Sequence, residues 1–145
     1  MLQASSSIII NAPPERVFQL LAQPEMLSRR MKSVKSFKVI SRGAGSMLTE
    51  TIAGADGRDT MFILELRFLP PFRMEFHQIK GELRSMEGAD VLEPEDNATR
   101  ITEAISFDIA IPLFGDLLGR AGIRQVIQRQ IEERLAVLKE LAEEG

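Results

Sequence analysis

Hydrophobic and polar residues alternate through the middle of the chain with the two-residue period of a β-strand. This pattern predicts strands at residues 34–41, 46–53, 58–69, 73–80, 89–93 and 99–111. An earlier strand is predicted at 5–10, where three serines precede three isoleucines. Turn-forming residues such as Gly43, Gly45 and Asp96-Asn97 separate these segments. Because turns this short join antiparallel neighbours, we expect one antiparallel sheet.

Prolines mark two short helices between the first strand and the second. Asn11 is the predicted N-cap of the first helix, and Pro13 lies in its first turn, where proline is tolerated. Pro24 interrupts the apolar stripe that follows, so a second short helix is predicted from there through Met31. Both helices precede the run of six consecutive strands.

Beyond Pro112, apolar residues recur every three or four positions, as in a helix that faces a core. They are Leu118, Ile123, Val126, Ile127, Ile131, Leu135, Leu138 and Leu141. Asp116 is the predicted cap of this helix, which at about 28 residues would be about 42 Å long. No other predicted element is large enough to cover the apolar face of a sheet. The sequence thus predicts an α+β fold: a seven-stranded curved antiparallel sheet wrapped around a long C-terminal helix, with two short helices after the first strand.

Length and composition limit the chemistry. The 145 residues are predicted to form a single ligand-binding domain, 1–145. The chain has no cysteine and one histidine, His77, which argues against disulfides, thiol nucleophiles and the common zinc sites. No metal and no cofactor are expected. No run approaches the roughly 20 apolar residues of a membrane span, and no signal peptide is recognised, so a cytoplasmic location is predicted.

One face of the sheet and helix is predicted to line an apolar space. A curved sheet and a straight helix touch along one line and diverge elsewhere, which leaves a gap that large side chains or a ligand must fill. His77 alternates with the apolar residues of its strand and is predicted to face solvent. The predicted ligand-binding residues are Phe62, Leu64, Leu66, Phe76, Met86, Asp90, Leu92, Glu103, Ile105, Phe107, Ile123, Val126 and Ile127. The alternative is that the apolar members of this set pack a filled core.

Two acidic residues share the inward face. If Leu92 pairs with Ile101 across the turn at 96–97, Asp90 lies opposite Glu103. Two carboxylates in a desolvated pocket do not both stay ionised without a large energetic penalty, so one pKa should rise. Asp90 and Glu103 are therefore candidates for a catalytic acid and base, or for holding a ligand hydroxyl or carbonyl. The alternatives are a one-residue shift in register, which would turn one of them to solvent, and a pocket mouth with enough water to solvate both. Glu50 is a third candidate for an inward acid.

A basic segment occupies residues 29–42. It contains six basic residues with no acidic residue between them: Arg29, Arg30, Lys32, Lys35, Lys38 and Arg42. Because the whole chain has a net charge of −3, the positive charge is concentrated here. The segment suits contact with anionic lipid head groups or RNA, and the alternative is an ordinary solvated surface.

Ordered motifs along the chain carry a family resemblance. They are the segments 10–18, 20–21, 24–25, 81–88, 92–94 and 99–102, and Pro112-Leu113 before the final helix. In these motifs the chain resembles the START-like helix-grip (SRPBCC) superfamily, closest to its polyketide cyclase/dehydrase and coenzyme Q-binding branches. The resemblance implies a deep apolar cavity for a lipid, quinone or polyketide-like molecule. The chain departs from the family pattern at Asp90, where relatives commonly carry tryptophan, and at Glu103, where an aromatic or aliphatic residue is usual.

Three functional hypotheses follow. The favoured one is binding or transport of a hydrophobic small molecule (lipid, isoprenoid quinone or polyketide-like) in an internal cavity, without catalysis. The second is a cyclase/dehydrase that uses Asp90 and Glu103 as acid and base. The third is a regulator that associates with the ribosome or an anionic membrane through the basic segment. The resemblance supports the ribosome here, because some coenzyme Q-binding-like relatives are described as ribosome-associated. The sequence predicts no oligomeric state.

Overall fold

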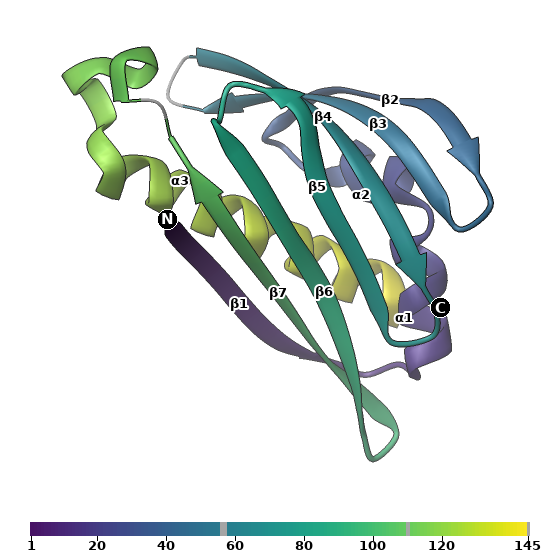
Figure 1. The fold of residues 1–145 in the computed structure, drawn as a ribbon. Helices are drawn as coiled ribbons and strands as arrows, with labels where there is room; N and C mark the ends of the chain where they lie inside the picture. The colour runs from purple at the N-terminus through teal and green to yellow at the C-terminus, as the bar shows by residue number, and fades with distance from the viewer. Residues whose placement is uncertain (56–57, 110, 145) are drawn as a thin grey trace.

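The sheet is continuous and entirely antiparallel, with the strand order β1-β7-β6-β5-β4-β3-β2 in a computed structural model that describes residues 1–55, 58–109 and 111–144. The strands are β1 (Leu2–Ile10), β2 (Val34–Gly43), β3 (Ser46–Ala55), β4 (Arg58–Leu69), β5 (Arg73–Gly81), β6 (Ser85–Glu95) and β7 (Ala98–Asp108). The helices are α1 (Pro14–Leu21), α2 (Pro24–Arg30) and α3 (Ile111–Glu143). Figure 1 shows the sheet curving around α3, which confirms the predicted α+β helix-grip architecture.

The predicted register between β6 and β7 is confirmed. Leu92 pairs with Ile101, and Asp90 pairs with Glu103. Burial alternates along β7, so that Thr99, Ile101, Glu103, Ile105 and Phe107 all point inward. This alternation is the two-residue period that the sequence shows.

The ends of several elements differ from the prediction. Asn11 is not the N-cap of α1, because Pro13 holds that position and makes no side-chain cap. The final strand was predicted to extend to Ile111, but β7 ends at Asp108 and α3 begins at Ile111. Asp116 therefore lies inside α3 and not at the start of the helix. Since proline is tolerated in the first turn of a helix, Pro112 is compatible with this earlier start.

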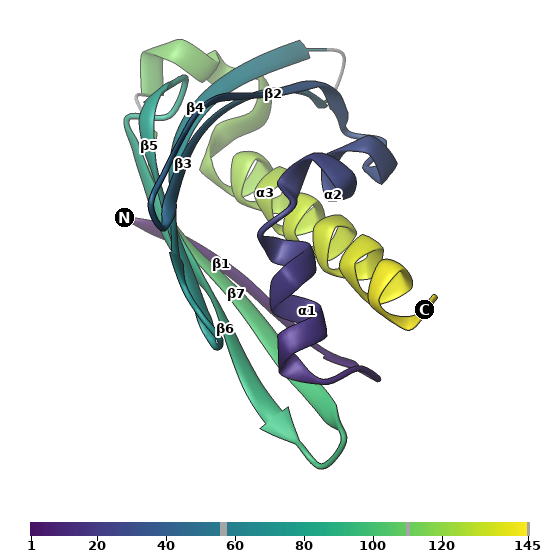
Figure 2. The same ribbon diagram turned by 90° about the vertical axis from the view of Figure 1, so that its right-hand side faces the viewer.

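The helices cover the concave face of the sheet unevenly. Seen along the sheet in Figure 2, α3 crosses this face, and α1 and α2 lie beside it. At one edge α3 lies against β1, and at the other edge α2 lies against β2. The completely buried side chains of the core include Ile10, Ile101 and Phe107 from the strands and Leu135 and Leu138 from α3.

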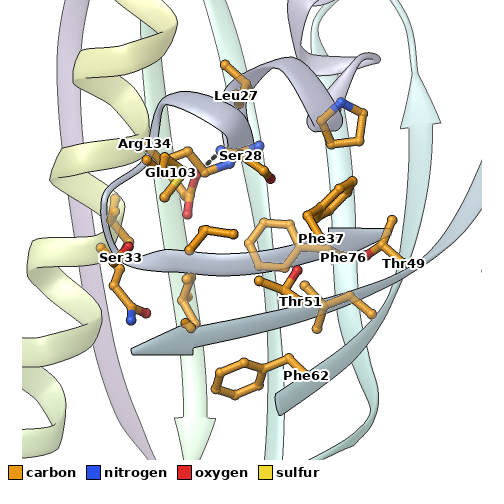
Figure 3. A pocket seen from close by; sticks show the side chains of 18 of the residues that line it. Leu27, Ser28, Ser33, Phe37, Thr49, Thr51, Phe62, Phe76, Glu103 and Arg134 are labelled. Atoms are coloured by element: carbon orange, nitrogen blue, oxygen red, sulfur yellow. Dashed lines mark hydrogen bonds and ion pairs between the residues drawn. The ribbon is translucent and has the colours of Figure 1, made fainter. Parts of the chain in front are cut away.

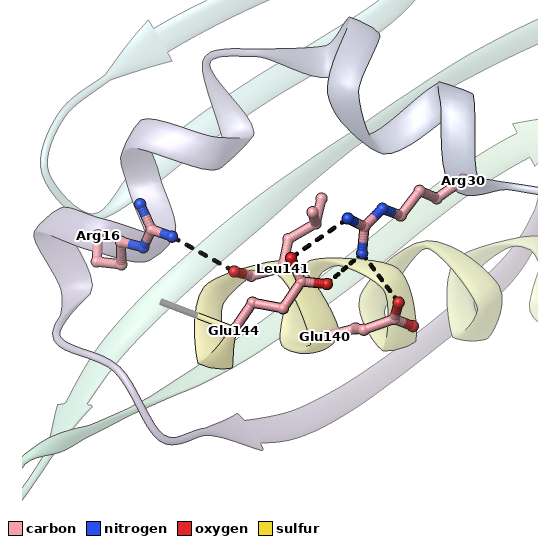
Figure 4. A network of polar contacts seen from close by, with 5 residues as sticks. All are labelled: Arg16, Arg30, Glu140, Leu141 and Glu144. Carbon is pink, nitrogen blue, oxygen red and sulfur yellow. Dashed lines mark hydrogen bonds and ion pairs between the residues drawn. The ribbon is translucent and has the colours of Figure 1, made fainter.

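A polar network fastens the short helices to the end of α3 (Figure 4). Arg30, the last residue of α2, contacts Glu140 at 2.9 Å and Glu144 at 2.5 Å. Arg16 of α1 donates a hydrogen bond to the backbone oxygen of Leu141 at 3.4 Å. These contacts hold α1 and α2 over the open side of the sheet.

Candidate functional site

A cavity of about 170 Å³ lies between the concave face of the sheet, α2 and α3. Figure 3 shows it from close by, with Phe37, Phe62 and Phe76 around one part and Glu103 with Arg134 at one end. The wall is largely apolar. The lining residues are Pro24, Leu27, Ser28, Met31, Ser33, Val34, Phe37, Thr49, Thr51, Ala53, Phe62, Leu64, Leu66, Met74, Phe76, Leu83, Met86, Glu103, Ile105, Ile127, Gln130, Ile131 and Arg134.

Eight of the predicted ligand-binding residues lie in this wall. They are Phe62, Leu64, Leu66, Phe76, Met86, Glu103, Ile105 and Ile127. They come from four strands and α3, so the fold brings distant parts of the sequence to one space. Their binding of a ligand stays a prediction.

Five other predicted residues lie elsewhere. Leu92 and Phe107 are completely or almost completely buried in the filled core, and Ile123 is also buried there. Asp90 has no exposed surface and lies behind the cavity wall. Val126 lies on the side of α3 that lines a groove outside the cavity. Most of these five side chains point inward, as the prediction requires. They do not line the cavity because the sheet and the helices pack directly against each other around them.

The walls contributed by α2, β2 and β3 were missed in the sequence. Strand β3 directs Met47, Thr49 and Ala53 inward, where their side chains are buried. Glu50 therefore points to the opposite face, where it pairs with Lys38 at 3.5 Å, and it is not an inward acid. Threonines occupy two of the inward positions of β3, so its sequence lacks the apolar alternation that marks the inward face of β4. His77 faces solvent as predicted and lies 4.0 Å from Glu65.

Phe76 depends on a glycine in the neighbouring strand. Gly88 pairs with Phe76 across β5 and β6. A Cβ atom at position 88 would lie 2.7 Å from the Phe76 ring and 2.5 Å from the backbone oxygen of Ala104. The missing side chain therefore lets this ring lie against the sheet and not further into the cavity.

The polar end of the cavity is a buried group of three charged side chains, which we call the charged triad: Asp90, Glu103 and Arg134. Nη1 of Arg134 donates a hydrogen bond to Oδ2 of Asp90 at 3.0 Å and another to Oε1 of Glu103. The side chain of Arg134 is 19% exposed, whereas those of Asp90 and Glu103 are 0% and 5% exposed. Glu103 and Arg134 line the cavity, and Asp90 supports Arg134 from behind.

Burial decides the protonation of this triad. Desolvation raises the pKa of Glu103 well above its ordinary value, and the positive charge of Arg134 only partly opposes this effect. The charge of Asp90 and a hydrogen bond to Asp90 raise the pKa of Glu103 further. Desolvation also lowers the pKa of Arg134, but the two carboxyl groups outweigh it and the net shift is upward. The raised pKa of Glu103 favours its neutral form and so gives the cavity a carboxylic acid beside the cationic Arg134.

Arg134 was not recognised in the sequence. A usable signal exists, because Arg134 follows Ile127 and Ile131 and precedes Leu138 at the three- and four-residue spacing of one helical face. A cation on the apolar stripe of a helix needs a buried partner. The inward acids Asp90 and Glu103 are those partners.

The basic segment 29–42 is largely neutralised by neighbouring carboxylates. Arg30 pairs with Glu140 of α3 and with Glu144 directly after it. The other pairs are Lys35 with Asp59, Lys38 with Glu50 and Arg42 with Glu25. These contacts weaken the positive field on which a membrane or ribosome interaction would depend. That interaction stays a prediction.

Candidate metal sites and membrane-spanning helices are absent from the part of the chain that the structure describes. No cluster of three or more histidine, cysteine or acidic side chains within residues 1–55, 58–109 and 111–144 could hold a metal ion. Among the helices that the structure describes, none is long and apolar enough to cross a membrane.

A curved antiparallel sheet around a C-terminal helix, with an apolar cavity between them, defines a START-like helix-grip domain. Residues 10–133 match the family described as "Polyketide cyclase / dehydrase and lipid transport". The chain belongs to this family. No curated protein matches the chain.

Solved structures support the same assignment of the fold. TTHA0849 of Thermus thermophilus is 29% identical, with a TM-score of 0.90 over 97% of each chain. The ZhuI aromatase/cyclase of a Streptomyces species is 14% identical, with a TM-score of 0.84 over 98% of this chain and 93% of that one. A START superfamily protein of Mycobacterium smegmatis is 13% identical, with a TM-score of 0.80 over 98% of this chain and 97% of that one. The last two show the fold alone.

Proposed function

We propose that the chain binds a hydrophobic small molecule, such as a lipid, an isoprenoid quinone or a polyketide-like compound, in the cavity between the sheet, α2 and α3. The main support for this function is the cavity itself. Its wall is mostly apolar with a few polar groups at one end, which is the usual composition of a small-molecule site. The family description, which includes lipid transport, agrees with this function.

The size of the cavity indicates how the ligand fits. Its volume of about 170 Å³ is close to that of an apolar protein cavity of roughly 150 Å³ that takes up benzene. Ligand pockets more often measure roughly 300–1,000 Å³. The cavity thus accommodates one ring or a short apolar chain, and the remainder of a larger ligand would extend out of it.

The first test is extraction of gently purified protein with organic solvent, followed by mass spectrometry, with a mock purification as control. A stoichiometric apolar compound would support the proposal and identify the ligand class. The protein has no tryptophan, so Phe62→Trp places a single indole at the cavity wall for a second test. We expect its emission to change on addition of a naphthoquinone or decanol.

Phe72→Trp is the matched control, because Phe72 is exposed on the turn between β4 and β5. Its emission should not change with either compound. The absence of an extracted compound, together with an unresponsive Phe62→Trp, would contradict the proposal.

A cyclase/dehydrase is the second candidate. Its support is Glu103, whose raised pKa makes it a proton donor at the cavity wall next to Arg134. Asp90 lies behind Arg134 and does not line the cavity. We therefore assign it the role of holding the guanidinium group in place, without contact to substrate. Turnover of a linear polyketone that Glu103→Gln abolishes while binding persists would favour this candidate. The absence of turnover leaves binding as the function.

A further inference from the structure

A second hollow, which we call the outer groove, lies directly outside the cavity. It is lined by Lys32, Ser33, Gly54, Val126, Arg129, Gln130 and Glu133 and has a volume of about 480 Å³. It runs between one face of α3 and the segment where β2 begins beside the end of β3. Ser33 and Gln130 line both the cavity and the outer groove, so the two spaces adjoin at these residues.

Two cations flank the outer groove. Lys32 and Arg129 are both exposed, and neither has a carboxylate partner among the described residues. Within the basic segment, by contrast, Arg30, Lys35, Lys38 and Arg42 each pair with a carboxylate. Lys32 and Arg129 therefore keep positive charge available on the two sides of one groove.

Among the described residues that line the outer groove, the one acidic side chain, that of Glu133, is occupied by other contacts. Glu133 accepts hydrogen bonds from the backbone N–H of Lys32 at 2.8 Å and of Ser33 at 3.4 Å. The hydroxyl group of Ser33 also donates to Glu133. Ser33 is fixed on its other side as well, since its carbonyl oxygen accepts from the N–H of Gly54 at 2.7 Å. Glu133 thus positions the loop at the boundary between the two spaces, and leaves Lys32 and Arg129 without an acidic partner.

Three zones follow one another from the cavity to the outer groove. Apart from the polar end formed by Glu103 and Arg134, the cavity wall is largely aromatic and aliphatic. The boundary carries the hydroxyl of Ser33 and the amide of Gln130, and the outer groove carries Lys32 and Arg129. An apolar molecule without charge would leave both cations unused. A molecule with an apolar body and an anionic end complements all three zones.

We propose that the ligand is an amphipathic anion, with its apolar ring or chain in the cavity and its carboxylate or phosphate group in the outer groove between Lys32 and Arg129. This inference rests on the proposed function, because it assumes that the cavity holds the apolar part. It narrows the ligand class to hydrophobic acids and alkyl or aryl phosphates.

Calorimetric titration with compounds that differ only at one end tests the inference. The probes are phenylbutyrate, phenylbutyl phosphate and the neutral phenylbutanol, whose phenyl ring suits a ring-sized cavity. We expect the double variant Lys32→Gln/Arg129→Gln to weaken binding of the anionic probes about tenfold, as two exposed charge contacts would. Its affinity for phenylbutanol should change less than about twofold. A stronger effect on the carboxylate or on the phosphate tells which head group the groove prefers.

The control variant is Arg67→Gln/Lys80→Gln, which removes the same two charges from exposed positions on β4 and β5 outside the outer groove. It should bind the anionic probes like the wild type. Equal affinities of the two double variants for both anions would overturn the inference. So would failure of both anions to bind while Phe62→Trp responds to a naphthoquinone, an outcome that leaves the proposed function standing. An unresponsive Phe62→Trp together with no binding of any probe overturns both.

Discussion

The two edges of the sheet meet the helical layer in different ways. At the β1 edge, α3 lies against the strand, and inward side chains such as Ile101 and Phe107 are completely buried. Towards the β2 edge, the cover is the short helix α2, and the inward residues Phe62 and Leu64 keep part of their surface exposed. Both halves have apolar inward faces, so hydrophobicity alone does not create the cavity. The covering helix differs between the two halves, and with it whether an inward residue becomes core or cavity wall.

Arg134 joins the two halves, and its replacement should have the largest effect. Arg134→Met removes the cation and leaves Asp90 and Glu103 buried together. Breaking a buried ion pair in this way destabilises a protein by about 3–5 kcal/mol. Because the burden comes from ionised carboxylates, the loss should be larger at about pH 8 than at about pH 5. Denaturant unfolding followed by circular dichroism at both pH values measures it.

Arg129→Met is the control for this variant, since Arg129 is exposed on the same helix. Its free energy of unfolding should stay within about 0.5 kcal/mol of the wild type. Equal stabilities of the two variants would show that the charged triad contributes nothing to the fold.

Two phenylalanines compare the halves directly. Phe107→Ala should lower the free energy of unfolding by about 3–5 kcal/mol, because Phe107 is completely buried on the closed side. Phe62→Ala should lower it by roughly half as much or less, because Phe62 borders an existing cavity and is partly exposed. Denaturant unfolding of both variants checks the ranking. A Phe62→Ala variant as unstable as Phe107→Ala would mean that the cavity half is as tightly packed as the other.

Gly88 lies beside the cavity wall, because it pairs with Phe76 across β5 and β6. Gly88→Ala places a Cβ atom 2.5 Å from the backbone oxygen of Ala104, which cannot move without disturbing β7. We expect a loss of about 1–3 kcal/mol from this overpacking, measured by thermal or denaturant unfolding. Gly54→Ala is the matched control, because its Cβ would meet only the flexible end of Lys35. Equal stabilities of these two variants would contradict the close packing of Phe76 on β6.

Of these variants, Glu103→Gln should change the free energy of unfolding least. Its effect should be small at acidic pH and grow as the pH rises. The pKa of Glu103 in the folded protein is raised above its ordinary value of 4.5. Between pH 4.5 and the raised pKa, the folded protein therefore keeps a proton that the unfolded chain releases. In this window wild-type stability falls as the pH rises. Glutamine mimics the neutral acid at every pH, so the variant lacks this contribution.

The measurement is the difference in free energy of unfolding between the wild type and Glu103→Gln, taken from about pH 4 to about pH 9. The difference should change in favour of the variant as the pH rises. A difference that stays constant across the whole range would show that Glu103 has the same pKa in the folded and the unfolded protein.

The sequence predicts what depends on periodicity and short turns. The seven strands, the antiparallel meander of β2 to β7 and the pairing of Asp90 with Glu103 follow from alternation and from the short turns. The pairing of β1 with β7 does not, because no short turn joins these two strands. The start of α3 does not follow, because Pro112 reads equally well as the end of a strand or as the first turn of a helix. Capping by Asn11 failed for a similar reason, since the side chain of a possible cap does not show which residue the chain will use.

The site is harder to predict because it depends on curvature. An inward Phe62 and an inward Phe107 look the same in a strand pattern, yet one lines the cavity and the other fills the core. Thr49 and Thr51 line the cavity although neither is apolar. Arg134 requires knowledge of two partners that precede it by more than thirty residues along the chain. Such tertiary pairings are not visible in local spacing.

The order of the strands also bears on how the molecule is made. Strands β2 to β7 pair with their neighbours in sequence, so this meander can form from short-range contacts as the chain emerges. By contrast, β1 must wait for β7, because Leu2 pairs with Phe107. The anchoring of α2 waits longer still, since Arg30 contacts Glu140 and Glu144 near the end of the chain. We therefore expect the cavity to be the last part of the molecule to close during synthesis, with the meander already in place.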